Sequence, residues 1–253
     1  MSRRVLITGG GSGIGRTYAR RFHAEGDRIA ICDADPAAVE AMRAELPGLI
    51  GAAVDVRDEA AMAEFLDAVE EEWGGADIVF ANAGTGGPAG RIEDISYQDW
   101  QDCVAVNLHG VFLTCRWAAR VMRAQGSGLI LLTSSTAGLF GYPNRSPYAA
   151  AKWAINGLTK TLAMELGPVG VRVNAIAPGA VEGERMERVL ANESRATGRP
   201  IEEIRASYVE CTSLKSWVSA DELADMALFL ASPAAAKVSG QIMAVDGHTE
   251  SIN

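Results

Sequence analysis

The stretch Thr8-Gly9-Gly10-Gly11-Ser12-Gly13-Ile14-Gly15 decides the fold of this chain of 253 residues. It follows a short apolar run at residues 5–8 that predicts a strand, and it opens a helix-like segment at residues 13–25. Glycines at such a turn let the backbone approach a pyrophosphate at the positive end of a helix. The spacing Gly9-x-x-x-Gly13-x-Gly15 departs from the G-x-G-x-x-G pattern, so a purely structural glycine turn is the alternative interpretation.

Short apolar runs alternate with helix-like segments along the chain, a pattern typical of βαβ units around a parallel sheet. Strands are predicted at residues 5–8, 28–33, 49–54, 78–81, 129–133, 172–176 and 241–244. Helices are predicted at residues 13–25, 36–45, 59–73, 97–124, 148–166 and 221–231. Because crossovers between parallel strands are right-handed, helices must cover both faces. We therefore expect an α/β Rossmann fold with a seven-stranded parallel sheet, in one domain over residues 1–253.

A long polar stretch at residues 179–219 interrupts this alternation between the sixth strand and the last helix. In an α/β sheet, an insertion after a strand lies over the carboxyl edge, where ligands bind. This position predicts a mobile substrate lid, with a solvated surface excursion as the alternative.

Composition excludes several functional classes. The net charge of −9 argues against a nucleic-acid surface, which needs clustered lysine and arginine. The four cysteines, Cys32, Cys103, Cys115 and Cys211, contain no C-x-x-C pair, so no metal site is expected and each is predicted to be buried. The apolar run near the N-terminus is too short for a signal peptide or a membrane span. A cytoplasmic protein with no membrane partner is the prediction.

The second strand ends at Asp33, eighteen positions after Gly15. A carboxylate there can accept hydrogen bonds from an adenosine ribose, and it repels a 2′-phosphate. Ser12 and Ala34 flank this position and add no cation, so the sequence predicts NAD rather than NADP. An aspartate that only begins a turn is the alternative.

Four residues at the carboxyl ends of later strands suggest a catalytic group: Asn107, Ser135, Tyr148 and Lys152. Tyr148 and Lys152 are four apart on a predicted helix, so they share a face and the ammonium favours the phenolate. Lowering a tyrosine pKa from about 10 to about 7 needs roughly 4 kcal/mol of preferential phenolate stabilisation. The alternative interpretation of Tyr148, taken alone, is an ordinary surface tyrosine on a helix. Ser134 is the alternative to Ser135 as the serine of this group.

Together these residues make the chain similar to the short-chain dehydrogenase/reductase family, in the NAD-dependent subgroup of this length. The motifs that carry the resemblance are Thr8-Gly9-x3-Gly13-x-Gly15, Asp55-Val56, Asn82-Ala83-Gly84, Asn107, Ser135, Tyr148-x3-Lys152 and Pro178-Gly179. The resemblance implies that Tyr148 is the acid/base and that Ser135 hydrogen-bonds the carbonyl or hydroxyl oxygen. It also implies that Lys152 holds the nicotinamide ribose and that Asn107 keeps a bent helix open around a water in a proton relay.

The same resemblance assigns the remaining cofactor contacts. It places the pyrophosphate on the turn, Asp55 and Val56 at the adenine, Asn82-Ala83-Gly84 at the ribose side and Pro178-Gly179 at the nicotinamide. The cofactor-binding set is thus Gly9, Ser12, Gly13, Ile14, Gly15, Asp33, Asp55, Val56, Asn82, Ala83, Gly84, Tyr148, Lys152, Pro178, Gly179 and Val181. Gly183 stands where the family often has a threonine that contacts the cofactor. We therefore expect the backbone of Val181 to hydrogen-bond the carboxamide of the nicotinamide, and we expect closure of the lid to be altered.

The substrate candidates are Ser135, Arg145, Tyr148 and Arg185. Arg145 lies three positions before Tyr148 and can pair bidentately with a carboxylate or sulfonate, or can be a solvated loop arginine. Further candidates are Thr85-Gly86-Gly87, Phe140, Tyr142, Glu184 and Arg188, of which the aromatic pair suits a cyclic ketone or only packing.

These residues predict an NAD-dependent oxidoreductase that interconverts a secondary alcohol and a ketone by hydride transfer. A small polar hydroxy compound, such as a sugar-derived acid or a polyol, is the expected substrate. A 3-oxoacyl-thioester ketoreductase and a non-catalytic dinucleotide-binding regulator are the alternatives. Asp33 and the net charge of −9 count against the first, and the complete catalytic group counts against the second.

The resemblance also implies a homotetramer. The predicted helix at residues 148–166 carries apolar residues around much of its circumference, namely Trp153, Ile155, Leu158, Leu162 and Met164. Such a helix must be buried on several sides, either within the chain or against a neighbouring subunit. The polar tail at residues 246–253 is a candidate for a contact with a second subunit.

Overall fold

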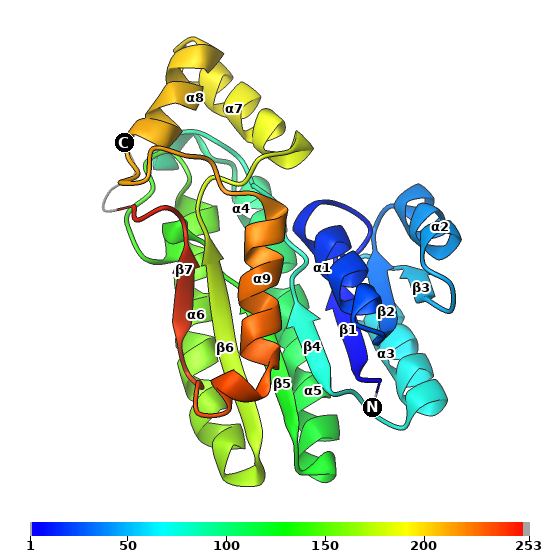
Figure 1. The fold of residues 1–253 in the computed structure, drawn as a ribbon. Coiled ribbons are helices and arrows are strands. Elements are labelled where there is room, and N and C mark those ends of the chain that lie inside the picture. The colour runs from blue at the N-terminus through cyan, green and yellow to red at the C-terminus, as the bar shows by residue number, and fades with distance from the viewer. Residues whose placement is uncertain (1, 250–253) are drawn as a thin grey trace.

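The seven strands form one parallel sheet in a computed structural model that describes residues 2–249. The strand order is β3-β2-β1-β4-β5-β6-β7 (Figure 1). The strands are β1 (Arg4–Thr8), β2 (Arg28–Asp33), β3 (Ile50–Ala53), β4 (Ile78–Ala81), β5 (Gly128–Thr133), β6 (Val171–Pro178) and β7 (Ile242–Val245). Every predicted strand is present, with ends shifted by one or two residues as strand boundaries commonly are. The predicted fold class is confirmed.

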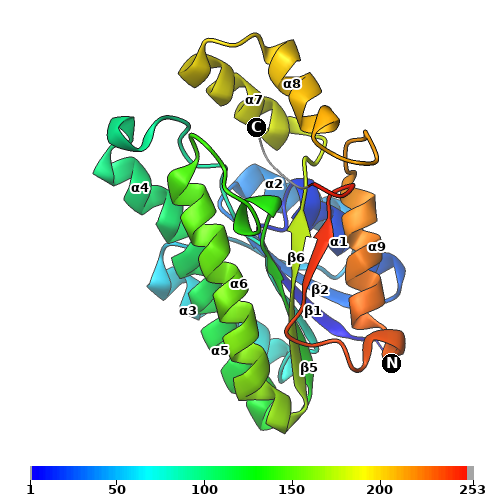
Figure 2. The same ribbon diagram turned by 90° about the vertical axis from the view of Figure 1, so that its left-hand side faces the viewer.

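Helices cover both faces of the sheet, as the right-handed crossovers require (Figures 1 and 2). One face carries α1 (Gly13–Ala24), α2 (Pro36–Glu45) and α9 (Ala220–Ala231). The other carries α3 (Glu59–Trp73), α5 (Gly110–Gln125) and α6 (Ser146–Leu166). Short 3-10 turns, η1 (Ile92–Asp94), η3 (Thr136–Gly138), η4 (Gly167–Val169) and η5 (Pro233–Ala235), join some of these elements.

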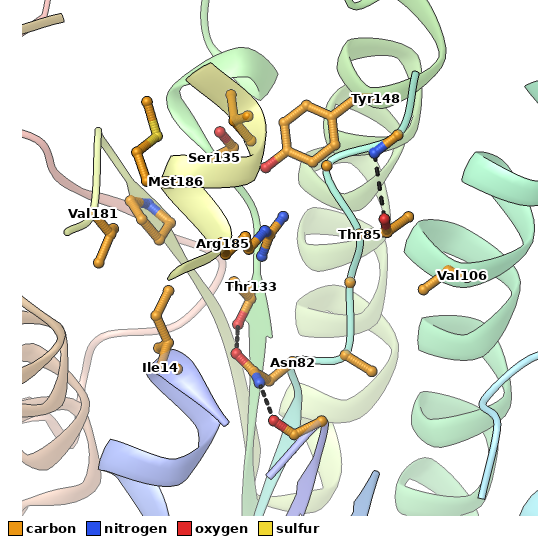
Figure 3. Close-up of a pocket in the computed structure, with 18 of the residues that line it drawn as sticks. Ile14, Asn82, Thr85, Val106, Thr133, Ser135, Tyr148, Val181, Arg185 and Met186 are labelled. Carbon is orange, nitrogen blue, oxygen red and sulfur yellow. Dashed lines mark hydrogen bonds between the residues drawn. The ribbon is translucent and has the colours of Figure 1, made fainter. Parts of the chain in front are cut away.

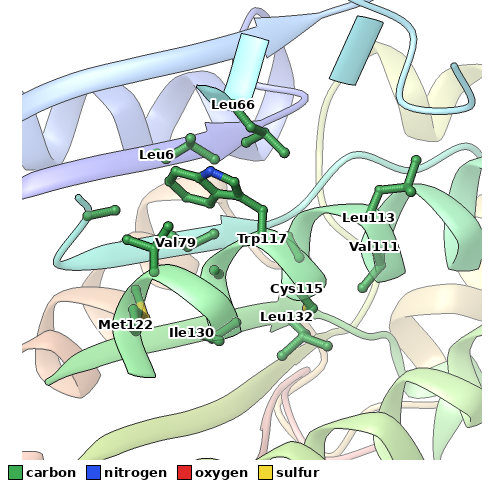
Figure 4. Close-up of a cluster of buried hydrophobic side chains, with 14 of the residues drawn as sticks. Leu6, Leu66, Val79, Val111, Leu113, Cys115, Trp117, Met122, Ile130 and Leu132 are labelled. Atoms are coloured by element: carbon green, nitrogen blue, oxygen red, sulfur yellow. The ribbon is translucent and has the colours of Figure 1, made fainter. Parts of the chain in front are cut away.

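The alternation of side chains along each strand divides the core into two clusters. In β1, Leu6 faces the cluster under α3, α5 and α6, while Val5 and Ile7 face the cluster under α1, α2 and α9. Figure 4 shows the first cluster, in which Trp117 of α5 lies among Leu6, Leu66 and Val79. Apolar side chains on both faces of a strand are typical of a buried parallel sheet, and they fix the register of the strands.

The predicted helix at residues 97–124 is interrupted, so that prediction is wrong in detail. The structure has α4 (Tyr97–Val104), a π-helical turn (Ala105–His109) and then α5. A π turn adds one residue to the helical repeat and is typical of functional sites. It lies at Asn107, whose side chain is fully buried.

The stretch at residues 179–219 contains two helices, α7 (Glu184–Thr197) and α8 (Ile201–Glu210). They lie together above the carboxyl ends of the strands, at the top of Figures 1 and 2. A bridge between Val181 and Val218 closes the base of this segment. The insertion therefore covers the edge of the sheet where ligands bind in such folds.

Three of the four cysteines are buried as predicted. Cys211 is only partly buried, so the prediction is wrong there. It ends α8 on the lid, away from both core clusters, and its thiol donates to the Tyr208 carbonyl. Among the described residues, no helix is both long and apolar enough to cross a membrane.

Candidate active site

A cleft of about 880 Å³ lies between the carboxyl edge of the sheet and the lid. It opens where the strand order reverses, because β1 pairs with β2 on one side and with β4 on the other. Open α/β sheets bind ligands at this switch point. The turn after β1, the ends of β2 to β6 and the first turn of α7 line it, and Figure 3 shows its inner part.

The glycines of the turn allow its backbone to pack closely against itself and against Ala83. A Cβ atom on Gly15 would lie 2.0 Å from the carbonyl oxygen of Gly9, and one on Gly9 would lie 2.9 Å from the Cα of Ala83. The first turn of α1 has no acidic residue, and the side chain of Ser12 does not cap it. The N–H groups and the positive helix end are therefore open to an anion, and the turn fits a pyrophosphate.

Asp33 holds the end of β2 beside this turn. Its carboxylate accepts hydrogen bonds from the N–H of Gly11 at 2.9 Å and of Asp35 at 3.1 Å, and it lines the cleft. Two arginines line the same end of the cleft, and both are already neutralised. Arg16 lies 2.7 Å from Glu45, and Arg57 lies 2.6 Å from Asp55. Among the described residues no cation lies within ion-pair distance of Asp33, so this end of the cleft offers an unneutralised carboxylate beside paired guanidinium groups.

The floor of the cleft is held by hydrogen bonds between three strands. Asn82 after β4 accepts from the hydroxyl of Thr133 at 3.0 Å and donates to the carbonyl oxygen of Thr8 at 3.0 Å (Figure 3). The Thr8 hydroxyl accepts from the N–H of Ala83 at 3.2 Å. These bonds fix the ends of β1, β4 and β5 relative to one another. Asn82, Ala83 and Gly84 all line the cleft, and Asn82 also supports it through these hydrogen bonds.

The predicted catalytic residues meet at the inner end of the cleft. Tyr148 and Lys152 lie on the first turns of α6, and Ser135 follows β5. The hydroxyls of Ser135 and Tyr148 point toward one another in Figure 3. The ammonium of Lys152 is buried, donates to the carbonyl oxygen of Thr133 at 2.7 Å and lies 5.6 Å from the centre of the Tyr148 ring.

The two adjacent serines have different surroundings. The hydroxyl of Ser134 donates to Asn156 of α6 at 2.7 Å, so it ties β5 to that helix. Ser135 accepts from the N–H of Ala137 at 3.1 Å and faces Tyr148. Of the two serines, Ser135 is therefore the one available to a reacting oxygen.

The charges around Tyr148 shift its titration. Burial alone raises the pKa of Tyr148, but Lys152, Arg185, the hydrogen bond to Ser135 and Arg145 together bring the pKa below its usual value. Burial lowers the pKa of Lys152 to about 8, against the opposing effect of Tyr148. A tyrosine and a lysine whose pKa values are both lowered are suited to proton transfer near neutral pH.

Asn107 presents a buried acceptor to this site. Its amide donates to the carbonyl oxygen of Cys103 at 2.9 Å, while its Oδ1 has no hydrogen-bond partner among residues 2–249. A Cβ atom on Gly84 would lie 2.9 Å from that oxygen, so glycine keeps the space open. A buried acceptor without a protein partner fits a bound water, which the π turn exposes toward Lys152.

Arg145 is neither a solvated arginine nor a free anion site. Its side chain is 3% exposed, and Nη1 lies 3.1 Å from Glu193 of α7. Nη2 donates to the carbonyl oxygen of Gly86, and the guanidinium stacks over Tyr142 and Tyr148 at 5.2 and 5.4 Å. The prediction that Arg145 anchors the substrate is therefore not supported, because its charge is already neutralised within the chain.

Comparison with known proteins identifies this arrangement. The family profile described as enoyl-(acyl carrier protein) reductase matches residues 9–248. A levodione reductase of Leifsonia aquatica is 36% identical over 249 residues, which is 96% of this chain and 92% of that protein. The chain belongs to the short-chain dehydrogenase/reductase family.

Other members of the family match over similar lengths. A D-beta-hydroxybutyrate dehydrogenase of Rhizobium meliloti is 34% identical and covers 98% of each chain. The crystal structure of an NAD+-bound xylitol dehydrogenase superimposes with a TM-score of 0.92 at 28% identity, covering 96% of this chain and 97% of that chain. An actinorhodin polyketide ketoreductase with NADPH gives the same TM-score of 0.92 at 32% identity, covering 97% and 96%. This dehydrogenase is therefore an oxidoreductase of CH–OH groups with a nicotinamide dinucleotide as cofactor.

The cleft of this short-chain dehydrogenase departs from its family after Pro178-Gly179. A Cβ atom on Gly179 would lie 2.8 Å from Asp246, so the glycine permits close packing there. Gly183, at the position where a threonine is expected, has a φ of 128° and precedes α7. Val181 lines the cleft beside Ile14, as Figure 3 shows, and its backbone pairs with Val218.

Two residues of the lid, Glu193 and Tyr208, were missed by the sequence analysis, and of these Tyr208 lines the cleft. The hydroxyl of Tyr208 in α8 donates to Glu193 at 2.7 Å, and the hydroxyl of Tyr142 donates to the same carboxylate at 3.1 Å. Neither Glu193 nor Tyr208 belongs to a motif, and only their place in the lid segment distinguishes them in the sequence. Tyr142, Glu184 and Arg188 line the cleft with residues 85–87, whereas Phe140 is not among the lining residues of the described chain. The tail at residues 250–253 lies outside the described part of the chain.

Proposed function

We propose that this protein is an NAD-dependent dehydrogenase that interconverts a secondary alcohol and a ketone on a small polar hydroxy compound. One observation carries the proposal: Tyr148 and Ser135, with the buried Lys152 beside Tyr148, meet at the end of a cleft whose other end is the open glycine turn. The names of the relatives, a levodione reductase and a hydroxybutyrate dehydrogenase, support alcohol and ketone substrates of small size.

NAD is proposed over NADP because of the adenosine end of the cleft. Asp33 lines this end, and the neighbouring arginines are bound to carboxylates. A carboxylate favours the two ribose hydroxyls and repels a 2′-phosphate. The pyrophosphate is assigned to residues 9–15, the adenine to Asp55 and Val56, and the nicotinamide to Pro178, Gly179 and Val181.

The chain's own residues manage the proton in the proposed reaction. When bound, a nicotinamide would supply the hydride acceptor for alcohol oxidation and the hydride donor for ketone reduction. During oxidation, the phenolate of Tyr148 takes the hydroxyl proton, while Ser135 donates a hydrogen bond to the same oxygen. Lys152 holds Tyr148 in the phenolate form, and a water at Asn107 passes the proton on to solvent. One alcohol thus loses a hydride to the cofactor and a proton to the solvent, which balances the reaction.

The proposed setting is a homotetramer in the cytoplasm. Support for the assembly comes from the outer face of α6, where Trp153 is 53% exposed and Met164 is 80% exposed. Large exposed apolar side chains on one helix are typical of an interface between subunits. The three buried thiols are compatible with a reducing compartment.

The test is the reduction of NAD and of NADP with a panel of hydroxy acids, sugar acids, polyols and cyclic alcohols. We expect turnover with NAD, and a decrease in kcat of at least roughly 10²–10⁴-fold in Tyr148→Phe, because the acid/base is lost. Tyr97→Phe is the matched control, since Tyr97 is 75% exposed on α4. Preference for NADP would contradict the cofactor assignment. Equal turnover by Tyr148→Phe would contradict the mechanism.

A further inference from the structure

The cleft contains one guanidinium that the chain does not neutralise. The other arginines that line it each have a carboxylate within ion-pair distance, namely Arg16 with Glu45, Arg57 with Asp55, Arg145 with Glu193 and Arg188 with Glu184. Within residues 2–249, Arg185 forms neither an ion pair nor a hydrogen bond. It is nevertheless only partly exposed and lines the same cleft.

The side chain of Arg185 extends inward. Figure 3 shows it reaching from the first turn of α7 toward the hydroxyls of Ser135 and Tyr148, above Thr133. Its charge lowers the pKa of Tyr148 by more than the hydrogen bond from Ser135 does, which agrees with a position close to the phenol. The pKa of Lys152 is also lowered by Arg185. Three cationic side chains, Lys152, Arg145 and Arg185, thus surround Tyr148, and of these only Arg185 has neither a hydrogen-bond nor an ion-pair partner among residues 2–249.

The position of Arg185 does not serve the stability of its helix. A cation in the first turn is opposed by the helix dipole, which favours anions at that end. A partly buried guanidinium without a partner also loses hydration that nothing in the chain replaces. Both costs are removed when an anion binds in front of it.

We propose that Arg185 binds a carboxylate of the substrate, so that the substrates of this site are hydroxy acids and their keto acids. Guanidinium and carboxylate match in planar, bidentate geometry. With the reacting oxygen held by Ser135 and Tyr148, the carboxylate at Arg185 fixes the second end of the molecule and presents one face of the carbinol carbon to the cofactor. The inference rests on the proposed function, because it uses the same cleft and the same reacting oxygen.

The cofactor diphosphate is the competing anion. The open N–H groups of α1 and the glycine turn already provide a site for it, whereas Arg185 points to the catalytic hydroxyls. Whether Arg185 binds the substrate or the cofactor is therefore tested by measuring the affinity for each ligand separately.

The experiment compares acids with their neutral amides: 3-hydroxybutyrate, 4-hydroxycyclohexanecarboxylate and gluconate, each with the corresponding amide. We expect the wild-type chain to favour an acid over its amide in kcat/KM. In Arg185→Met, kcat/KM for that acid should fall roughly 10–100-fold, mainly through KM, since a hydrogen bond to a charged group is lost. Loss of Arg185 also raises the pKa of Tyr148 for both substrates, so the comparison is made at the high-pH plateau of oxidation, where kcat/KM for the amide and the Kd of NAD should change little. Arg195→Met, an exposed arginine on the same helix, is the matched control.

A second measurement keeps the proposal testable if none of these acids is turned over. The NAD complex of the wild-type chain should gain thermal stability from at least one of the acids, and Arg185→Met should not. Preference for amides, or acids that neither react nor stabilise the complex, would overturn the proposal. A Kd for NAD that weakens by the same factor would assign Arg185 to the cofactor instead. Turnover of neutral polyols by both proteins would leave the dehydrogenase assignment standing and remove only the carboxylate site.

Discussion

Tyr148 changes its charge under the opposing effects of burial and of the cations around it. Burial raises its pKa, and Lys152, Arg185 and Ser135 bring it below the usual value for tyrosine. Oxidation needs the phenolate and reduction needs the phenol. We expect kcat/KM for alcohol oxidation to rise with pH and level off below the usual tyrosine pKa of about 10, and kcat/KM for ketone reduction to fall over the same interval.

The contribution of Lys152 to this profile is open to a direct test. In Lys152→Gln the positive charge is lost, so the pKa of Tyr148 rises. The rise of kcat/KM for alcohol oxidation with pH should therefore occur at higher pH. Because Tyr148 and Lys152 titrate as a pair, the profile reports the pair and not either group alone. Steady-state rates at fixed saturation with NAD measure the shift. If kcat/KM for oxidation rises over the same pH interval in Lys152→Gln as in the wild-type chain, a group other than Lys152 controls the titration.

We expect Asp33 to discriminate between the two cofactors by charge. Its carboxylate faces the adenosine end of the cleft, where a 2′-phosphate would add two like charges. We expect Asp33→Asn, which keeps the shape, to raise the ratio of kcat/KM for NADP over NAD by at least roughly tenfold, since about 1.4 kcal/mol of lost repulsion suffices. The double variant Asp33→Ser with Ala34→Arg should raise it further.

The control for this prediction is Asp35→Asn, two positions along the chain. Asp35 caps α2 through the N–H of Ala37 at 2.9 Å, so an amide there keeps an acceptor. The ratio should not change in this variant. If Asp33→Asn loses NAD turnover and gains none with NADP, the carboxylate acts on the ribose alone and the repulsion argument is wrong.

The lid is fastened to the catalytic helix by a single carboxylate. Glu193 of α7 accepts from Arg145 at the start of α6, from Tyr142 in the preceding loop and from Tyr208 in α8. Because Arg145 also stacks on Tyr148, the position of the lid and the position of the catalytic phenol are linked. The two helices of the lid therefore depend on an ion pair as well as on apolar packing.

We expect Glu193→Ala to loosen the lid. The variant leaves the buried charge of Arg145 without a partner, which typically costs about 3–5 kcal/mol. Hydrogen exchange should accelerate in residues 184–210 while the sheet stays protected, and KM should rise more than kcat falls. Glu187→Ala is the matched control on the same helix. Glu187 is exposed and its partner Arg205 is partly exposed, so exchange and KM should stay near the wild-type values. If hydrogen exchange in residues 184–210 is unchanged in Glu193→Ala, Glu193 does not hold the lid against α6.

The elements that the sequence predicts are those with a local cause. The turn at residues 8–15, the seven apolar runs and the pair Tyr148 and Lys152 all follow from spacing within a few residues. The π turn at Asn107 has no such signal, since the helical pattern continues across residues 97–124 without a break. Only the family resemblance predicts a distortion at this place, because it implies a bent helix at Asn107.

Contacts between distant elements explain the remaining errors. Arg145 and Glu193 are forty-eight positions apart, and their pairing depends on how the lid folds back over α6. No spacing rule relates them, so an arginine beside the catalytic tyrosine resembled a substrate anchor. For the same reason the sequence could name Arg185 but could not show that it is the unpaired cation, because pairing is a property of the fold.

At the scale of the whole molecule, the outer face of α6 is the main unexplained surface. Trp153 and Met164 are eleven positions apart, about three helical turns, so they lie on one stripe that is exposed in the single chain. Their exposure excludes the alternative that this helix is buried within the chain on all sides. Phe112 on α5 is also exposed, at 50%. Apolar side chains of this size on a helix face are stabilised when a second copy covers them.

We therefore expect the chain to form a homotetramer in solution and the double variant Trp153→Glu with Met164→Lys to form smaller species. Opposite charges are placed at the two ends of the stripe so that the net charge of the chain is unchanged. Light scattering after size exclusion measures the mass directly. Ile92→Glu, at an apolar residue 69% exposed in η1, is the control and should keep the wild-type mass.

Since the catalytic helix α6 carries the stripe, loss of the neighbour should also lower the thermal stability of the chain in a concentration-dependent way. A double variant with the wild-type mass would show that α6 is not part of the interface, and a wild-type monomer would refute the tetramer itself.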